Sequence, residues 1–515
     1  MIFSGDSCYF VVIFSLILGR PDSFWAKKCI DLEMFRVIEG NSRGLADVER
    51  FIGLINGERR DFFDPGRDVF VARAPGRLDV MGGIADYSGS AVLQMPIAEA
   101  TLAAVQKSDD RKVRVVSLLG DEALECEIDL SGLKIAGTSQ KYNDVREFLA
   151  QDPANHWAAY AAGVFPVLEG DLNMDFQTGA RMLIYSGIPV GKGVSSSAAL
   201  EVAAMQAVCA AFDIGIGPLE TALLCQKVEN LIVGAPCGMM DQIASHCGEE
   251  NSLLHILCDR AEIRGAISIP GEIEFWGIDS GVRHAVAGSD YTSVRIGAFI
   301  GYRIIADIRG FPVRRTGDGL VEIDDPVFRG CLSNIDPQIY ETFFEKALPV
   351  EIKGKDFLER YAGVTDRVTK IDPGTVYPVR AATEHPIMES MRVRDFSTRL
   401  RSMQSSDWRR KLGELMFRSH ESYRVCGLTE PATERIVGLV RENTGRGLYG
   451  ARITGGGSGG TVAVLARKGS RAVIGEIAKR YERETGRVPY IFHGSSPGCS
   501  AFGWLRLRRM PDAPP

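Results

Sequence analysis

The stretch Gly187-Ile188-Pro189-Val190-Gly191-Lys192-Gly193-Val194-Ser195-Ser196-Ser197-Ala198-Ala199-Leu200-Glu201 decides how this chain folds around its site. The apolar run Met182 to Tyr185 before it is typical of a strand, and Ala198 to Phe212 after it has small and apolar residues at helical spacing. The glycines and serines therefore form a loop that opens a helix. The natural ligand of such a loop is a phosphate, because backbone N–H groups and the positive end of the helix point at it. An ordinary connection before a core helix is the alternative.

Two better-known phosphate motifs do not fit the sequence. The P-loop needs four residues between its glycines, whereas three separate Gly187 from Gly191, and a glycine instead of Ser or Thr follows Lys192. The segment Gly455 to Gly460 matches G-x-G-x-x-G, but Thr461 to Ala466 after it is strand-like rather than helical. This order of elements excludes the dinucleotide-binding motif.

Composition limits the classes of protein. The chain has 515 residues, of which 45% are hydrophobic, which is enough for a large core and more than one domain. Its net charge is -6 and it has no polybasic run, so we expect no nucleic-acid partner. The 11 cysteines lack C-x-x-C spacing, which favours reduced thiols and a cytoplasmic protein.

The N-terminus carries an apolar run, Tyr9 to Leu18, that is too short to span a bilayer. Its flank has no Lys or Arg and no small-residue cleavage site follows, so residues 1–66 are interpreted as an extension, with Met34 as an alternative start. An export signal or anchor is the alternative. We expect no contact with a membrane.

The first motif with chemical groups follows a strand-like run, Val69 to Ala72. Pro75-Gly76 is expected to turn the chain, and the loop beyond holds one cation and two carboxylates, Arg77, Asp79 and Asp86. These groups could hold sugar hydroxyls or a phosphoryl group in transfer. A salt-bridged turn is the alternative.

Two acids stand near the end of a predicted helix, Gly217 to Ile232. Glu229 lies on this helix and Asp241 follows the next turn. If the turn folds back, Glu229 can reach a metal while Asp241 meets a substrate hydroxyl. The alternatives are a solvated helix face for Glu229 and a helix N-cap for Asp241. The aromatic pair Trp157 and Tyr160 is assigned to the core.

These stretches, together with Gly450 to Thr461, resemble in order and spacing the motifs of the GHMP small-molecule kinases. Pro75-Gly76-Arg77 and Asp241-Gln242 resemble galactokinases, while Gly191 to Ala199 and Trp276 to His284 look like the kinase part of plant-type L-arabinokinases. The resemblance implies an α+β fold of two domains, ribosomal-protein-S5-like and ferredoxin-like.

The resemblance also implies domain limits. The N-terminal ATP-binding domain is expected at 67–265 and the C-terminal domain at 266–510. A stretch without clean periodicity, 309–376, is interpreted as an insertion over the mouth of the site, and Leu505 to Arg509 as an edge strand.

Carried over residue by residue, the resemblance implies a complete site for ATP, Mg²⁺ and a sugar. The residues expected to wrap the phosphates are Gly191, Lys192, Gly193, Val194, Ser195, Ser196, Ser197 and Ala198. The expected sugar contacts are Asp86, Gly238, Tyr291, Gly456 and Gly457. Ser197 and Glu229 match the magnesium ligands. Asp241 matches the carboxylate that takes the proton of the sugar hydroxyl, and Arg77 matches the cation beside it.

The implied activity is that of an ATP- and magnesium-dependent sugar 1-kinase. Where galactokinases have an acidic residue and a histidine, this chain has Gly83 and Ile84. The groups that would bind the hydroxymethyl end of a hexose are thus absent, which favours L-arabinose and the product β-L-arabinose 1-phosphate. A galactokinase or another sugar 1-kinase is one alternative, and a non-catalytic sugar or nucleotide sensor is the other; the sequence leaves the oligomeric state open.

Overall fold

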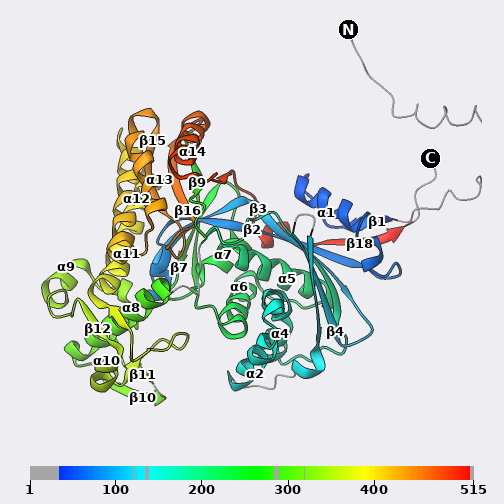
Figure 1. Cartoon of the computed structure of the whole chain (residues 1–515), viewed down its shortest axis with the longest axis horizontal. Helices are drawn as coiled ribbons and strands as arrows, with labels where there is room; N and C mark the ends of the chain where they lie inside the picture. Colours follow the sequence, from blue (N-terminus) through cyan, green and yellow to red (C-terminus); the bar gives the residue numbers. More distant parts are fainter. Residues whose placement is uncertain (1–33, 120–121, 134–138, 284–288, 318, 511–515) are drawn as a thin grey trace, which may run out of the picture.

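The computed structural model describes residues 34–119, 122–133, 139–283, 289–317 and 319–510. The apolar run at 9–18 and the position of His284 lie outside these ranges. The chain forms two halves, each with a sheet and its helices, which meet in the middle of the molecule (Figure 1). The predicted mixture of helices and sheets is therefore confirmed. Within the described ranges, no helix is long and apolar enough to cross a membrane.

The first half is built on a nine-stranded sheet. Its strands are β1 (Met34–Glu39), β2 (Val69–Met81), β3 (Ala91–Lys107), β4 (Lys112–Leu119), β5 (Glu122–Asp129), β6 (Ala180–Ser186), β7 (Ser252–Leu257), β8 (Glu262–Ser268) and β18 (Leu505–Met510). The turn predicted at Pro75-Gly76 is wrong, because β2 continues through both residues and pairs with β3 on either side of a bulge. The bulge accommodates a proline that cannot donate to the ladder. Arg77 and Asp79 consequently lie on a buried strand.

Helices cover one face of this sheet. They are α2 (Ser139–Ala150), α3 (Ala159–Ala162), α4 (Val164–Leu172), α5 (Ser196–Phe212), α6 (Pro218–Lys227) and α7 (Met240–Cys247). The helix α5 is rich in alanine and buried on most sides, so it packs closely against β2 and β3. The helix α6 runs into one π-helical turn, η6 (Val228–Val233), which carries Glu229. A π-turn often marks a functional position in a helix.

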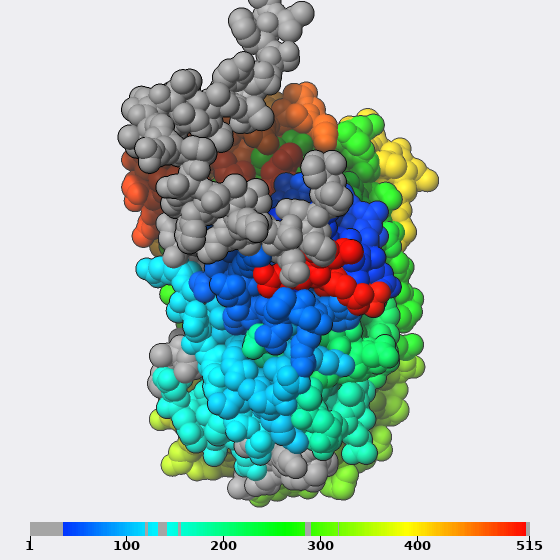
Figure 2. Space-filling model, turned by 90° about the vertical axis from the view of Figure 1, so that its right-hand side faces the viewer, coloured from blue at the N-terminus to red at the C-terminus, as the bar shows by residue number. Residues whose placement is uncertain are grey.

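The last strand, β18, forms as predicted but not at an edge. It lies between β1 and β2, as the red strand among blue neighbours in Figure 2 shows. Leu505 and Leu507 are fully buried under α1 (Ala46–Asn56), whereas Arg506 and Arg508 alternate with them and pair with acids. This alternation of leucine and arginine would fit an edge strand as well as an inner one. The extension strand β1 covers it, which the sequence did not indicate.

The second half is built on a four-stranded sheet in the order β15 (Leu448–Ile453), β16 (Thr461–Arg467), β9 (Ile273–Asp279) and β17 (Ile491–His493). Its helices are α11 (Val379–Ser402), α12 (Trp408–Val425), α13 (Pro431–Glu442) and α14 (Arg471–Thr485). The sequence pattern predicts two helices here, Arg380 to Met391 and Phe396 to Met403, but α11 runs unbroken through both. The helix does not end between them because Val393 shares one buried core with Phe396 and Leu400.

The segment 309–376 contains short elements rather than irregular chain. They include β10 (Val313–Gly317), β11 (Gly319–Ile323), η7 (Leu332–Asn334), α9 (Pro337–Ile339), η8 (Tyr340–Phe344), β12 (Glu351–Lys353), α10 (Gly354–Tyr361) and β13 (Gly363–Val364), and β14 (Val376–Pro378) closes it. These elements pack with α8 (Ser289–Arg309) and α11 in one apolar cluster. In Figure 1 they form the yellow-green end of the molecule, beside α8.

Candidate active site

A pocket of about 800 Å³ lies between the first sheet and the helices that cover it. It is lined in turn by residues of β2, β3, β6, β4 and β5, which is the order of these strands in the sheet. The second half contributes Arg283, Tyr291 and Gly456 to the wall. The pocket therefore extends from the junction of the two halves across the first sheet.

The glycine- and serine-rich loop forms one wall of this pocket. Gly191 and Gly193 adopt positive φ angles of 76° and 71°, and Ser195 reaches 59° at the start of α5. Ser195 makes no capping hydrogen bond with its side chain, and Ser196 and Ser197 line the pocket. The N–H groups of the first turn of α5 are thus available to an anion, as the phosphate-loop interpretation requires.

Three predicted phosphate-binding residues lie outside the pocket wall. The ammonium group of Lys192 is 2.6 Å from the Asp279 carboxylate at the end of β9. Val194 and Ala198 are buried in the core, at 1% and 0% exposure. The Lys192 side chain thus binds the second half and the other two anchor the loop, so a contact of these three residues with phosphate stays a prediction.

Arg77 and Asp241 form an ion pair at the centre of the site. The Arg77 Nε and Nη2 atoms lie 2.9 and 2.8 Å from Asp241 Oδ1, and Nη1 donates to the Gly193 carbonyl at 2.9 Å. The Arg77 side chain is 3% exposed, whereas that of Asp241 is 22% exposed. The pair therefore joins the phosphate loop to a carboxylate that remains open to the pocket. Asp241 lies inside the first turn of α7, and its side chain makes no capping hydrogen bond to that helix. The interpretation of Asp241 as a helix N-cap is therefore wrong.

Glu229 points into the same pocket from the π-turn. It accepts a hydrogen bond from Gln242 Nε2 at 2.6 Å and another from the Ser197 hydroxyl. Burial and the nearby Asp241 charge raise the pKa of Glu229 to about 7. The interpretation as a solvated helix face is wrong, since Glu229 is 3% exposed.

The remaining predicted sugar contacts, Gly457 excepted, also line this pocket. Asp86 lies on the short helix η3 (Gly83–Ser88), and a Cβ atom at Gly238 would come within 1.7 Å of its carboxylate. Burial, together with the Asp241 charge, raises the pKa of Asp86 to about 7. Gly238 is therefore required to admit the Asp86 carboxylate to the wall, beside Tyr291 and Gly456.

Asp79, which was predicted as a ligand group, is a scaffold group instead. Its carboxylate is 2.7 Å from Arg452 Nη1, and both side chains are 0% exposed. It also accepts hydrogen bonds from the N–H groups of Gly83 and Gly455. Asp79 thus fixes the start of η3 and the second glycine-rich loop to each other.

Tyr423 of α12 holds the same two segments. Its hydroxyl accepts from the Ile84 N–H at 2.8 Å and donates to the Gly455 carbonyl at 2.7 Å. A Cβ atom at Gly83 would come within 1.8 Å of this hydroxyl, so Gly83 does not face the pocket, whereas Ile84 does.

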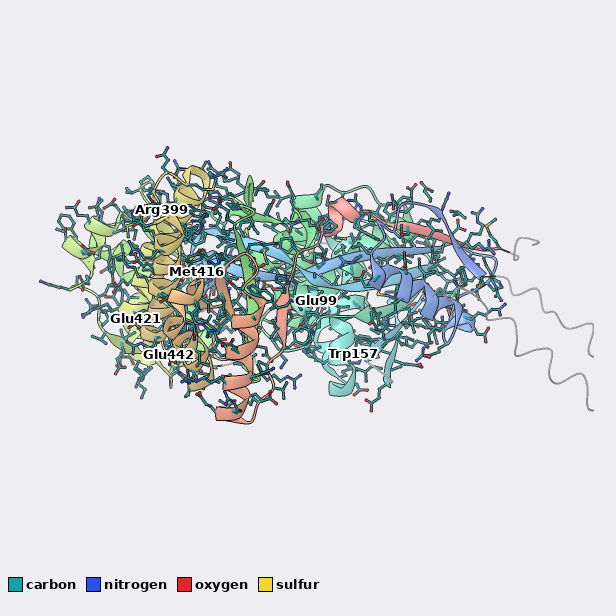
Figure 3. All side chains as sticks on the ribbon, turned by 90° about the horizontal axis from the view of Figure 1, so that it is seen from above. Glu99, Trp157, Arg399, Met416, Glu421 and Glu442 are labelled. Carbon is teal, nitrogen blue, oxygen red and sulfur yellow. The ribbon has the colours of Figure 1, made fainter. Side chains whose placement is uncertain are left out.

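One part of the pocket wall was missed by sequence reasoning. It is mainly apolar and includes Leu124, His156, Trp157, Tyr160 and Leu200. Trp157 and Tyr160 pack on the core as predicted, but they also line the cavity; Figure 3 shows Trp157 in the half built on the first sheet. An aromatic, apolar slot next to a phosphate loop suits a planar base. Core and pocket aromatics have the same sequence pattern, so no signal distinguished them.

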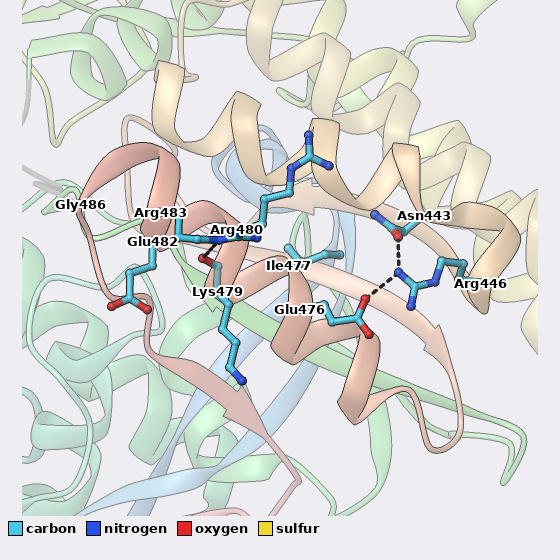
Figure 4. A pocket seen from close by; sticks show the side chains of 9 residues that line it. All are labelled: Asn443, Arg446, Glu476, Ile477, Lys479, Arg480, Glu482, Arg483 and Gly486. Carbon is cyan, nitrogen blue, oxygen red and sulfur yellow. Dashed lines mark hydrogen bonds and ion pairs between the residues drawn. The ribbon is translucent and has the colours of Figure 1, made fainter.

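A second hollow, of about 780 Å³, lies on the surface between α14 and η9 (Thr444–Arg446) (Figure 4). Two of its charged side chains, Arg446 and Glu476, form an ion pair at 2.7 Å. No predicted site residue lines it. The pocket of the first half is therefore the candidate active site.

Comparison with known proteins agrees with this geometry. Residues 159–249 match the GHMP kinases N terminal domain, residues 403–483 match the GHMP kinases C terminal domain, and residues 60–107 match the galactokinase galactose-binding signature. A galactokinase of Chloroflexus aggregans is 30% identical over 81% of this chain and 89% of that protein. The chain belongs to the GHMP kinase family, and the predicted two-domain fold of that family is confirmed.

The relatives of this chain within the family include sugar kinases. An L-arabinokinase of Arabidopsis thaliana is 42% identical over 96% of this chain and 54% of that protein, so the chain spans about half the length of this relative. Lactococcus lactis galactokinase in complex with galactose has the same fold, with a TM-score of 0.66 at 19% identity over 87% of this chain and 99% of that one. The predicted resemblance to galactokinases and L-arabinokinase is thereby confirmed.

Proposed function

We propose that this chain is an ATP-dependent sugar 1-kinase that phosphorylates L-arabinose to β-L-arabinose 1-phosphate in the cytoplasm. The observation that carries the proposal is the Arg77–Asp241 pair, which stands between a phosphate loop and a wall of sugar-binding groups. Phosphoryl transfer needs an oriented hydroxyl, a cation and in-line positioning, and little covalent chemistry from the protein. The names of the relatives support the same activity.

In this proposal the residues of the chain perform two tasks. Asp241 orients the anomeric hydroxyl and accepts its proton as the sugar oxygen bonds to the γ-phosphorus, while the bond from that phosphorus to the ADP oxygen breaks and ADP leaves. The Arg77 guanidinium lies beside Asp241 and stabilises the negative charge of the phosphoryl group in transfer.

Few protein groups would bind Mg²⁺ directly. Among the described residues, no group of three or more His, Cys, Asp or Glu could hold a metal ion. One hydroxyl and one carboxylate, Ser197 and Glu229, suit Mg²⁺, which retains water and phosphate oxygens as its other ligands. When bound, the metal would neutralise charge on the phosphates. It would also relieve the repulsion between Glu229 and Asp241 that raises the pKa of Glu229.

Ile84 supports a pentose as the substrate. It presents an apolar side chain to the pocket where a hexose kinase of this family would need a polar group. Gly83 contributes nothing to this contrast, because the Tyr423 hydroxyl fills the space beside it. An apolar wall discriminates by about 1–3 kcal/mol for one missing CH2OH group, so slow turnover of D-galactose is expected.

The test is coupled ADP release by the purified full chain with L-arabinose, D-galactose and D-glucuronate. The proposal expects the highest kcat/KM for L-arabinose. Preference for D-galactose would leave a sugar kinase with another substrate. Binding of ADP and sugar without turnover would favour the sensor. Ile84→His should lower the preference for L-arabinose over D-galactose by about tenfold, and an unchanged ratio would contradict the role of Ile84.

A further inference from the structure

The inserted segment 309–376 contacts elements that carry the pocket wall. None of its described residues lines the pocket. It nevertheless meets η3, where the Ser333 hydroxyl donates to the Ser88 carbonyl at 3.0 Å, and it meets α8 through the carboxylate of Asp366. The segment was predicted to lie over the mouth of the site, whereas these contacts are with η3 and α8.

Asp366 binds a buried arginine of α8 with both carboxylate oxygens. The Arg295 Nε and Nη2 atoms donate to it at 2.9 and 3.0 Å, and the two side chains are 6% and 3% exposed. Asp366 also accepts from the Val368 N–H and the Thr369 hydroxyl, so its position is fixed by its own segment. Although burial acts in the opposite direction, these hydrogen bonds hold the pKa of Asp366 below its usual value. A charged pair in this position is bidentate and geometrically specific.

The rest of the Arg295 guanidinium faces the sugar end of the pocket. Nη1 donates to the Cys237 carbonyl at 3.3 Å, immediately before Gly238. The guanidinium carbon lies 5.4 Å from the centre of the Tyr87 ring, and that ring meets Tyr291 edge to face at 6.1 Å. One arginine thus touches the backbone beside Gly238 and the aromatic support of Asp86 and Tyr291.

We propose that the inserted segment positions the sugar-binding wall through Asp366, with Arg295 as the link; the proposal rests on the function proposed above. Asp366 and Arg295 act as positioning residues. They fix the carbonyl at 237 and the ring of Tyr87, and with them the places of Gly238, Asp86 and Tyr291. None of the contacts of this pair described above involves the phosphate loop, so changes in the pair should affect the sugar rather than ATP.

The first variant is Asp366→Asn, with Asp325→Asn as its matched control. Asp325 lies in the same segment and also binds a side chain of α8, the Tyr302 hydroxyl at 2.6 Å, but it makes no contact with the pocket wall. Asp366→Asn should raise the KM for sugar by about tenfold and leave the KM for ATP within about twofold. Asp325→Asn should leave both KM values within about twofold.

The double variant Arg295→Met/Asp366→Asn separates positioning from stability. It removes both charges, so no charged side chain remains buried and unpaired, and Asn still accepts from the Val368 N–H. Its urea midpoint should lie nearer to wild type than that of Asp366→Asn, while its sugar KM stays raised. A double variant with the sugar KM of the wild type would overturn the proposal, because the pair would then be structural only.

Amide hydrogen exchange of residues 234–242 gives a readout that needs no turnover. Exchange in this segment should rise in Asp366→Asn and in the double variant but not in Asp325→Asn. Unchanged exchange there in both test variants would overturn the positioning role whatever the substrate. Failure of the wild type to phosphorylate any sugar would instead contradict the proposed function alone.

Discussion

The two ends of the pocket are built in different ways. The end that we propose binds phosphate comes from one continuous stretch, Gly191 to Ser197, which follows β6 and ends in the first turn of α5; all its residues except Lys192 and Val194 line the pocket. The sugar end comes from β2, η3, the turn before α7, α8 and the loop between β15 and β16. Buried charged groups hold these parts together: Asp79 with Arg452, and Arg295 with Asp366.

The difference between the two ends follows from the chemical groups that each ligand requires. Phosphate is recognised by backbone N–H groups, which a short loop and a helix start can supply locally. A sugar is recognised by hydrogen bonds in several directions, so groups from distant parts of the chain must converge. Groups that converge on a buried wall must be cross-linked by buried ion pairs and hydrogen bonds. A buried charged group that lacks part of its partners lowers the stability of the protein. The predictions below test this contrast between a local and a cross-linked end.

The largest effect is expected where the two ends meet. Asp241→Asn should lower kcat by about 10²–10⁴-fold, because the side chain no longer accepts the proton of the hydroxyl but still accepts from Arg77. The KM values should change little. Steady-state kinetics measure this, with Asp109→Asn at an exposed ion pair as the control. Near-normal turnover would remove Asp241 from the proposed role.

At the sugar end, Arg452→Met should destabilise the protein by about 3–5 kcal/mol, because it leaves Asp79 buried and unpaired. Urea unfolding gives this free energy. The control is Arg508→Ala, which breaks an exposed pair with Asp68 and should leave the free energy of unfolding close to that of the wild type. Equal losses in the two variants would contradict the cross-linked description of the sugar end.

Tyr423→Phe should cost about 1–3 kcal/mol, because the Ile84 N–H and the Gly455 carbonyl both lose their partner in the buried wall. The KM for sugar should rise more than the KM for ATP, since the two segments border the sugar end. Tyr490→Phe is the matched control, because the Tyr490 hydroxyl binds Glu99 at the surface. If the KM for ATP rises as much as that for sugar, Tyr423 does not act on the sugar end alone.

The last prediction concerns the pH dependence of stability. The pKa of Asp86 is about 7 in the folded chain against 3.8 as its ordinary value, so the unfolded chain loses this proton first as the pH rises. The contribution of Asp86 to the free energy of unfolding of the ligand-free protein should therefore fall between about pH 4 and pH 7 and level off above that. Asp86→Asn should reduce the slope in this window by about 1 kcal/mol per pH unit. An unchanged slope would show that Asp86 is already ionised in the folded chain.

The sequence determined the local features of the fold. The strand-like residues of Ile273–Asp279 predict the strand that forms there, and the helical periodicity of Pro431–Glu442 predicts a helix, because both signals lie within the segment itself. The strand, loop and helix around Ser197 follow for the same reason. The motifs also indicated that Arg77, Glu229 and Asp241 belong to one site, and the structure brings them together.

Only the tertiary structure decided which groups face the pocket and which support it. Asp79, Asp86 and Arg77 occur in one motif, yet Asp79 binds Arg452 in the core while the other two line the cavity. Lys192 lies in the phosphate loop but binds Asp279 of the second half. A polar residue has the same sequence signal whether it meets a ligand or a partner hundreds of residues away, because that choice depends on non-local packing and the demand that buried charges be paired.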